Sequence, residues 1–134
     1  MDSTILGGLC WYYGIGYLDY QKVYKMILCA VFIILAAVCK AVVDTISHHF
    51  YESIFSRLNP KFWNPEISWM NKGTKTLKRT LFVSLTDAWH LFGLLERVFI
   101  ILAAFLCPDW IFLFIMYGLF INTFHILYTY IFRR

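Results

Sequence analysis

The chain has 134 residues, of which 60% are hydrophobic and only 15% are charged, and its formal net charge is +4. A soluble domain carries roughly 45–50% apolar and about 25% charged residues, so the composition argues against a soluble enzyme or binding module. The four cysteines are scattered without CxxC spacing, which argues against a disulfide framework or a thiolate metal site. The sequence predicts a single domain over residues 1–134, an all-α polytopic membrane bundle with three or four transmembrane helices.

Four apolar segments are the candidate spans. Residues 4–20 are short and glycine-rich, and form either a tightly packed first span or a re-entrant segment, because a spanning helix needs about 20 residues. Residues 26–47 form a clear span whose last two turns become polar. Residues 81–107 are long enough for a tilted helix or for one that breaks near Gly93. Residues 110–132 form the last span.

Residues 53–80 form the long polar connection. Two Asn-Pro pairs in its NPKFWNP sequence predict turns, because proline removes a backbone donor and restricts the residue before it. Six of the twelve Lys and Arg residues lie between Arg57 and Arg79, and short basic loops stay in the cytoplasm. We therefore expect this loop and the C-terminus on the cytoplasmic side of a bacterial inner membrane, with the loop near anionic lipid headgroups rather than nucleic acid.

Ionisable side chains occur inside three of these spans, where they are costly and are functional candidates by default. Asp44 and His48 are four residues apart and share a helix face, and Asp87 and His90 are three residues apart. With the expected orientation, these pairs and a histidine of the last span lie at similar depth. Three imidazoles and two carboxylates suit zinc, iron or manganese. The predicted metal ligands are Asp44, His48, Asp87, His90 and His125.

A metal at this site would make the protein a hydrolase, because a bound metal lowers the pKa of its water. Glu52 or His49 would then act as the general base. Lys40, which shares the helix face of Asp44, would hold an anionic group, and Asn64 would contact the substrate from the loop.

Three other interpretations stay open. The polar side chains could form a buried hydrogen-bonded network, or a proton pathway, that does not hold a metal. They could line the lumen of a homo-oligomeric channel or pore-forming effector, with the glycine-rich first segment as its contact face. The chain could also be a structural or accessory subunit that binds lipid or a partner through its basic loop.

Residues 59–72, NPKFWNPEISWMNK, and residues 85–92, LTDAWHLF, resemble a group of small bacterial and phage membrane proteins of unknown function. The resemblance extends over residues 44–92, a little over a third of the chain, and these two segments carry it. It implies that the loop and the turn within LTDAWHLF belong together. A folded-back loop in which Trp63, Asn64 and Trp69 cap the polar site would agree with it.

Overall fold

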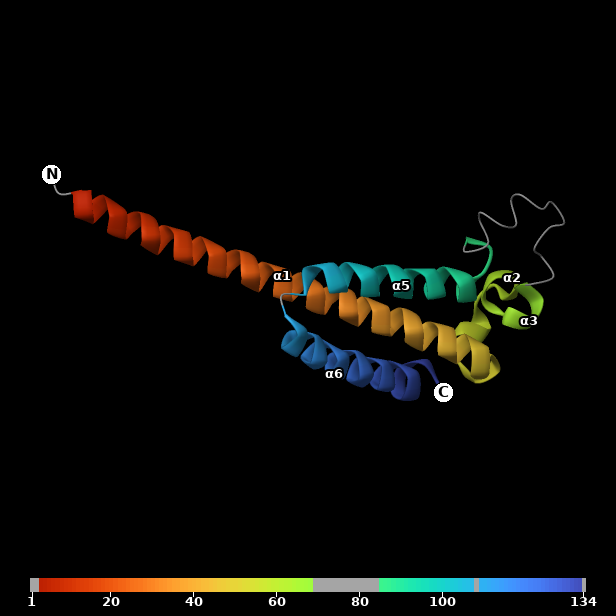
Figure 1. Cartoon of the computed structure of the whole chain (residues 1–134). Helices are drawn as coiled ribbons and strands as arrows, with labels where there is room; N and C mark the ends of the chain where they lie inside the picture. Colours follow the sequence, from red (N-terminus) through yellow and green to blue (C-terminus); the bar gives the residue numbers. More distant parts are fainter. Residues whose placement is uncertain (1–2, 69–84, 108, 134) are drawn as a thin grey trace.

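The computed structural model describes residues 3–68, 85–107 and 109–133, with side chains from Tyr20 onward. This part of the chain is helical and contains no extended strand. Its long helices are α1 (Ser3–His48), α5 (Ala88–Leu106) and α6 (Trp110–Ile126). They run alongside one another, with α1 in contact with both of the others (Figure 1). The predicted all-α bundle is confirmed.

Helix α1 is continuous over 46 residues, which makes it about 69 Å long at 1.5 Å per residue. The apolar pattern predicted two segments in this region, 4–20 and 26–47. The helix instead runs through Lys22 and Lys25 without a break, because lysine is a good helix former and no proline intervenes. The first part of α1 extends beyond the ends of α5 and α6 (Figure 1). A hydrocarbon core about 30 Å thick holds only one crossing of such a helix.

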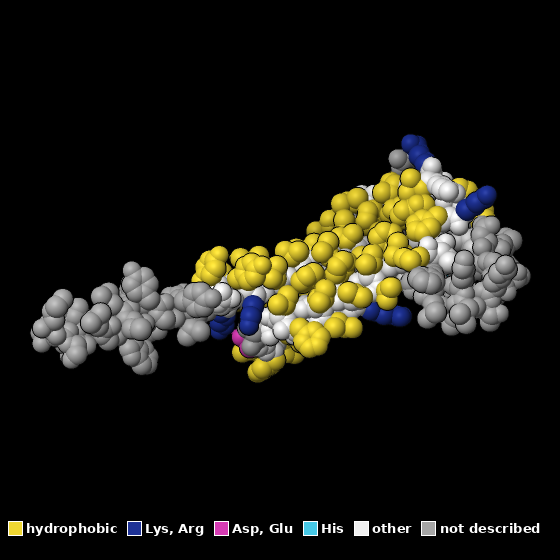
Figure 2. Space-filling model, turned by 90° about the horizontal axis from the view of Figure 1, so that it is seen from above, with side chains coloured by type: hydrophobic (Ala, Val, Ile, Leu, Met, Phe, Trp, Pro, Cys, Tyr) yellow, Lys and Arg dark blue, Asp and Glu magenta, His cyan; other side chains and the backbone are white. Residues whose placement is uncertain are grey.

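Three helices in the described residues are long and apolar enough to cross a membrane: Tyr20–His48, Ala88–Leu106 and Trp110–Phe132. Large apolar side chains such as Phe105 and Trp110, which are 85% and 70% exposed, lie on their outer surface. Hydrophobic side chains cover most of the face seen in Figure 2. A soluble protein does not present such a continuous apolar surface to water, so the chain is a helical membrane protein.

The third span begins later than predicted and does not break. Helix α5 starts at Ala88 because Asp87 caps its first turn, and it passes through Gly93 without interruption. Residues 81–84 lie outside the described part of the chain. So do residues 69–80 of the loop, which include Trp69 and most of the basic side chains of that loop. The last span matches its prediction, since α6 continues into a wider π-helical turn, η5 (Leu127–Phe132).

Small residues of α1 let the other helices approach closely. Ala36, Ala37 and Ala41 are completely buried, and small side chains are the usual contact residues between helices in lipid. At the end away from the loop, Cys29 and Ile33 of α1 pack with apolar residues of α5 and α6. The loop-side end has its own cluster around Ile46 and Phe50.

Four short helices close the loop-side end of the bundle: η1 (Phe50–Glu52), η2 (Ile54–Arg57), α2 (Pro60–Trp63) and α3 (Pro65–Ser68). Each proline of NPKFWNP is the first residue of a short helix, where its missing N–H costs nothing. Asn59 caps α2 by accepting a hydrogen bond from Lys61 N at 3.1 Å. Phe55 stacks on Trp63 and contacts Phe132, which ties these helices to the end of η5.

Candidate functional site

Asp87 organises the loop-side end of α5. Its Oδ1 accepts a hydrogen bond from the backbone N–H of His90 at 2.8 Å, so it is the N-cap of the helix. The same carboxylate lies 2.8 and 2.9 Å from Nδ1 of the His90 ring. Because an ionised carboxylate only accepts hydrogen bonds, Nδ1 carries the proton. Asp87 is 2% exposed, so a buried carboxylate fixes the orientation of the imidazole.

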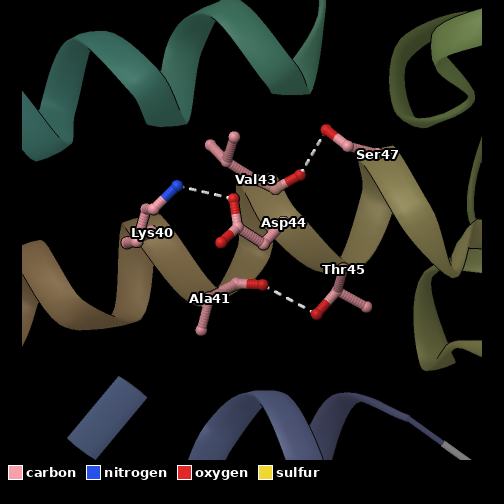
Figure 3. Close-up of polar contacts among 6 residues, drawn as sticks. All are labelled: Lys40, Ala41, Val43, Asp44, Thr45 and Ser47. Atoms are coloured by element: carbon pink, nitrogen blue, oxygen red, sulfur yellow. Dashed lines mark hydrogen bonds and ion pairs between the residues drawn. The ribbon is translucent and has the colours of Figure 1, made fainter. Parts of the chain in front are cut away.

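Lys40 and Asp44 form an ion pair along α1. Lys40 Nζ lies 2.7 Å from Asp44 Oδ1, and both side chains are partly exposed (Figure 3). The nearby hydroxyls of Thr45 and Ser47 donate to carbonyls four residues earlier, at 2.7 Å each. Local partners therefore satisfy the polar groups of this face of α1.

A cavity of about 270 Å³ lies between helices α1 and α5. Its polar lining consists of Lys40, His90, Glu96 and Arg97, and its apolar lining of Val43, Trp89, Gly93 and Leu94. A Cβ added to Gly93 would meet no heavy atom within 4 Å, so this glycine leaves space open. The cavity therefore brings an ammonium, a guanidinium, an imidazole and a carboxylate together between two membrane-spanning helices.

Glu96 and Arg97 lie deep in the span. Arg97 is the tenth of the nineteen residues of α5, and that helix is about 29 Å long, close to the thickness of a hydrocarbon core. Lys40, Asp44 and Arg97 are the charges that act on Glu96. Within the described ranges, neither Glu96 nor Arg97 forms an ion pair. Neither residue was among the predicted site residues, although adjacent charges at the centre of an apolar segment were a usable signal.

The five predicted metal ligands do not converge. In the described parts of the chain, no three His, Cys, Asp or Glu side chains lie close enough to hold a metal ion. Asp87 and His90 contact each other, whereas Asp44 pairs with Lys40. His48 is exposed, and so is His125, whose Nδ1 lies 3.4 Å from the Thr129 hydroxyl.

Helix rotation is the reason for this difference. Helix α6 turns Phe124 and Tyr128 toward the buried cluster, and His125 lies about 100° away from Phe124 on the helix. Helix α1 likewise buries Thr45 and Ile46 and leaves His48 outside. Equal depth in the membrane, which the prediction used, does not place side chains on facing surfaces.

The remaining predicted residues lie among the short helices and not in the cavity. His49 Nδ1 is 3.6 Å from Glu52 Oε2, and Glu52 is largely exposed. Asn64 is buried, caps α3 by accepting from Glu66 N at 2.9 Å, and donates to the Tyr51 hydroxyl at 3.3 Å. That hydroxyl donates in turn to Glu66 at 2.7 Å. The contacts of Asn64 are thus those of a residue that shapes the loop, and Lys40 alone of the predicted anion-binding pair lines the cavity.

Comparison with known proteins did not identify a relative of this chain. No protein-family model, no curated protein and no solved structure matches the chain. The function must therefore be inferred from the residues of the cavity.

Proposed function

We propose that this protein binds the phosphate group of a membrane lipid headgroup in the cavity between α1 and α5. The observation that carries the proposal is the meeting of Lys40, His90 and Arg97 around one cavity inside the spanning helices. The ammonium of Lys40 and the guanidinium of Arg97 can donate hydrogen bonds to an anion and are hard to explain as packing groups, because each is costly to place in lipid.

Arg97 makes the strongest demand for a ligand. A charged side chain at the centre of a spanning helix costs about 2.5–3.5 kcal/mol on insertion scales. Asp44 offsets the charge of Lys40 at 2.7 Å, whereas Arg97 has no ion-pair partner in the described residues. A phosphate would supply one, since the planar guanidinium matches two phosphate oxygens at once.

His90 would complete the binding site from the loop side. It is the third residue of α5 and lies near the rim, whereas Arg97 lies two turns deeper. The carboxylate of Asp87 holds Nδ1 of the ring and so fixes the orientation of the imidazole beside the cavity. His90 would thus help to position the ligand.

The proposed orientation places the loop and the C-terminus in the cytoplasm, in a bacterial inner membrane. Ser53 and Arg133 pair through their backbones, so the loop and the end of the chain lie at the same end of the bundle. Both regions carry basic residues, as the positive-inside rule expects for a cytoplasmic side. The cavity would then open to the inner leaflet.

A metal-dependent hydrolase and a channel would each require an arrangement of residues different from the one described. A metal-dependent hydrolase needs at least three ligands around one ion, and the described residues of one protomer offer no such group. A channel needs a polar path across the whole bilayer, but Cys29, Ile33 and Ala103 fill the bundle on the side away from the loop. An oligomeric pore is a second candidate, in which the exposed Arg97 side chain would face another copy.

Headgroup binding can be tested with glycerol 3-phosphate, added to the purified protein in neutral detergent and followed by ligand-observed NMR. Arg97→Gln should weaken binding at least about tenfold, because hydrogen bonds to charged groups contribute roughly 1.5–3 kcal/mol. Arg57→Gln, which removes an exposed loop charge, is the matched control and should bind normally. Equal binding by both variants would overturn the proposal.

A further inference from the structure

A second cavity lies beside the first, on the side toward the far end of the bundle. It has a volume of about 480 Å³, a size typical of sites for small molecules. Its lining is apolar and aromatic and comes from all three long helices: Ile33, Ile100, Leu113, Phe114, Tyr117 and Phe120. Ionisable groups thus line one cavity, and none except the tyrosine hydroxyl lines the other.

The two cavities follow the same helix faces. On α1, Ile33 precedes Lys40 by seven residues, and on α5, Ile100 follows Arg97 by three. At 100° per residue these spacings keep Ile33 within about 20° of Lys40, and Ile100 within about 60° of Arg97. The rise of 1.5 Å per residue separates Ile33 from Lys40 by about 10 Å along the axis. A ligand with a polar end and an apolar end could therefore occupy both cavities.

We infer that both cavities together hold one phospholipid, with its headgroup in the polar cavity and an acyl chain in the apolar one. This inference rests on the proposed headgroup binding and extends it to the identity of the ligand. The order of the cavities along the helices supports it, because the polar one begins near the loop-side rim and the apolar one follows toward the far end, as the headgroup and the chain of one lipid do.

The charges around the polar cavity favour a phosphoethanolamine headgroup. A phosphate alone would satisfy Arg97 and Lys40 but would be repelled by the carboxylate of Glu96. An ammonium next to the phosphate would face that carboxylate instead. The pair of opposite charges on the ligand would then match the pair on α5.

Photo-crosslinking separates a bound lipid from lipids that merely surround the protein. The probe is a phosphatidylethanolamine with a diazirine in the middle of one chain, present as a minor component of phosphatidylcholine nanodiscs. Mass spectrometry should find crosslinks at Leu113 and Phe114 several-fold more often than at Ile115, a neighbour on α6 that is about as exposed as Phe114 but does not line the cavity. Equal crosslinking at these positions would overturn the inference.

If one lipid occupies both cavities, binding of its headgroup and binding of its acyl chain are coupled. Arg97→Gln should lower the crosslinks at Leu113 several-fold, although it removes no atom from the apolar cavity. Arg57→Gln should leave them unchanged. If Arg97→Gln loses glycerol 3-phosphate binding but keeps the crosslinks, the chain site is independent of the headgroup, and the inference fails while the proposed function stands.

Filling the apolar cavity gives the reciprocal test. Ile100→Trp should abolish the cavity crosslinks and leave glycerol 3-phosphate binding intact, whereas Ile101→Trp, at the more exposed neighbouring position, should change neither. Leu113→Trp fills the same cavity from α6 and replaces Ile100→Trp if that variant does not fold. A diazirine-bearing phosphatidylglycerol should crosslink less than phosphatidylethanolamine in the wild type, and equal yields would overturn the assigned headgroup.

Discussion

At the residue scale, the charged side chains near the polar cavity divide into those that have an ion-pair partner among the described residues and two that do not, Glu96 and Arg97. Asp87 is buried and holds both the first turn of α5 and the ring of His90. Lys40 and Asp44 neutralise each other. Arg97, at the middle of α5, has no ion-pair partner among the described residues. We propose that the phosphate of a bound headgroup supplies the missing partner of Arg97.

Replacing Asp87 tests its double role. Asp87→Ala should destabilise the protein by about 1–2 kcal/mol, because it removes a helix cap. Asp109→Ala is the matched control: Asp109 caps α6 by accepting from Phe112 N at 2.8 Å but is exposed. Thermal unfolding of both variants in the same detergent gives the comparison. Equal losses would mean that burial and the contact with His90 add nothing.

The imidazole of His90 offers a more specific measurement on the same residue. Asp87→Asn keeps a good capping side chain but removes the carboxylate that holds Nδ1–H. Nitrogen NMR of the labelled His90 ring should show the Nδ1-protonated tautomer in the wild type and a mixture in Asp87→Asn. An unchanged tautomer in the variant would refute the orienting role of Asp87.

At the element scale, sequence and structure agree on which segments are helices in the membrane and differ on how those helices are turned. Hydropathy is a sum over about twenty residues, so it located the spans despite errors in their ends. Rotation about a helix axis depends on which side chains pack against neighbours. The position of His125 next to the partly buried Phe124 could not be deduced from the α6 sequence, which is apolar on every side.

The start of α5 was predictable in principle. Asp87 followed by an apolar helical segment is a typical N-cap signal, but Asp87 was interpreted as a metal ligand. The unbroken α1 was harder to foresee. Lys22 and Lys25 look like an interface between two spans, and only the helix-forming tendency of lysine indicated that the helix continues.

The continuity of α1 predicts a distance. Spin labels at Lys22 and Ser47, both exposed positions in a cysteine-free background, should lie about 38 Å apart along a straight helix at 1.5 Å per residue. Pulsed electron paramagnetic resonance measures this separation in nanodiscs. A hairpin between segments 4–20 and 26–47 would leave this distance unchanged, and a second pair of labels is therefore needed. Labels at Ser3 and Lys25 should lie about 33 Å apart if α1 is continuous. A much shorter value for the second pair would contradict the single helix.

Gly93 and Gly118 form a matched pair on two helices. A Cβ at either position meets no heavy atom within 4 Å, but only Gly93 lines the polar cavity. Gly93→Leu should therefore block glycerol 3-phosphate binding and leave the fold intact, whereas Gly118→Leu should bind normally. Circular dichroism checks the fold of each variant. Normal binding by Gly93→Leu would place the ligand elsewhere.

At the scale of the whole molecule, the long helix α1 packs against the two shorter helices α5 and α6. The polar cavity between α1 and α5 lies in the half of the bundle near the loop. The backbone pairing of Ser53 with Arg133 brings the loop and the chain end together. In the far half, Cys29, Ile33 and Met116 belong to an apolar cluster. The proposed ligand would therefore enter the protomer from the loop side.

The dispersed positions of the predicted metal ligands lead to an expectation for the purified protein. Metal analysis after gentle purification should find zinc, iron and manganese well below stoichiometric amounts, because no three ligands meet in the described residues. Asp87→Ala and His90→Ala should not change these values. A stoichiometric metal that both variants lose would restore the hydrolase interpretation.

The most direct test of headgroup binding at Arg97 is native mass spectrometry of the protein released from nanodiscs made of a bacterial lipid extract. The wild type should retain one phospholipid after extensive delipidation, and Arg57→Gln should retain it as well. Arg97→Gln should lose it, because the guanidinium is the main partner of the phosphate. Retention of the same lipid by Arg97→Gln, or its absence from the wild type, would contradict a headgroup site in this cavity.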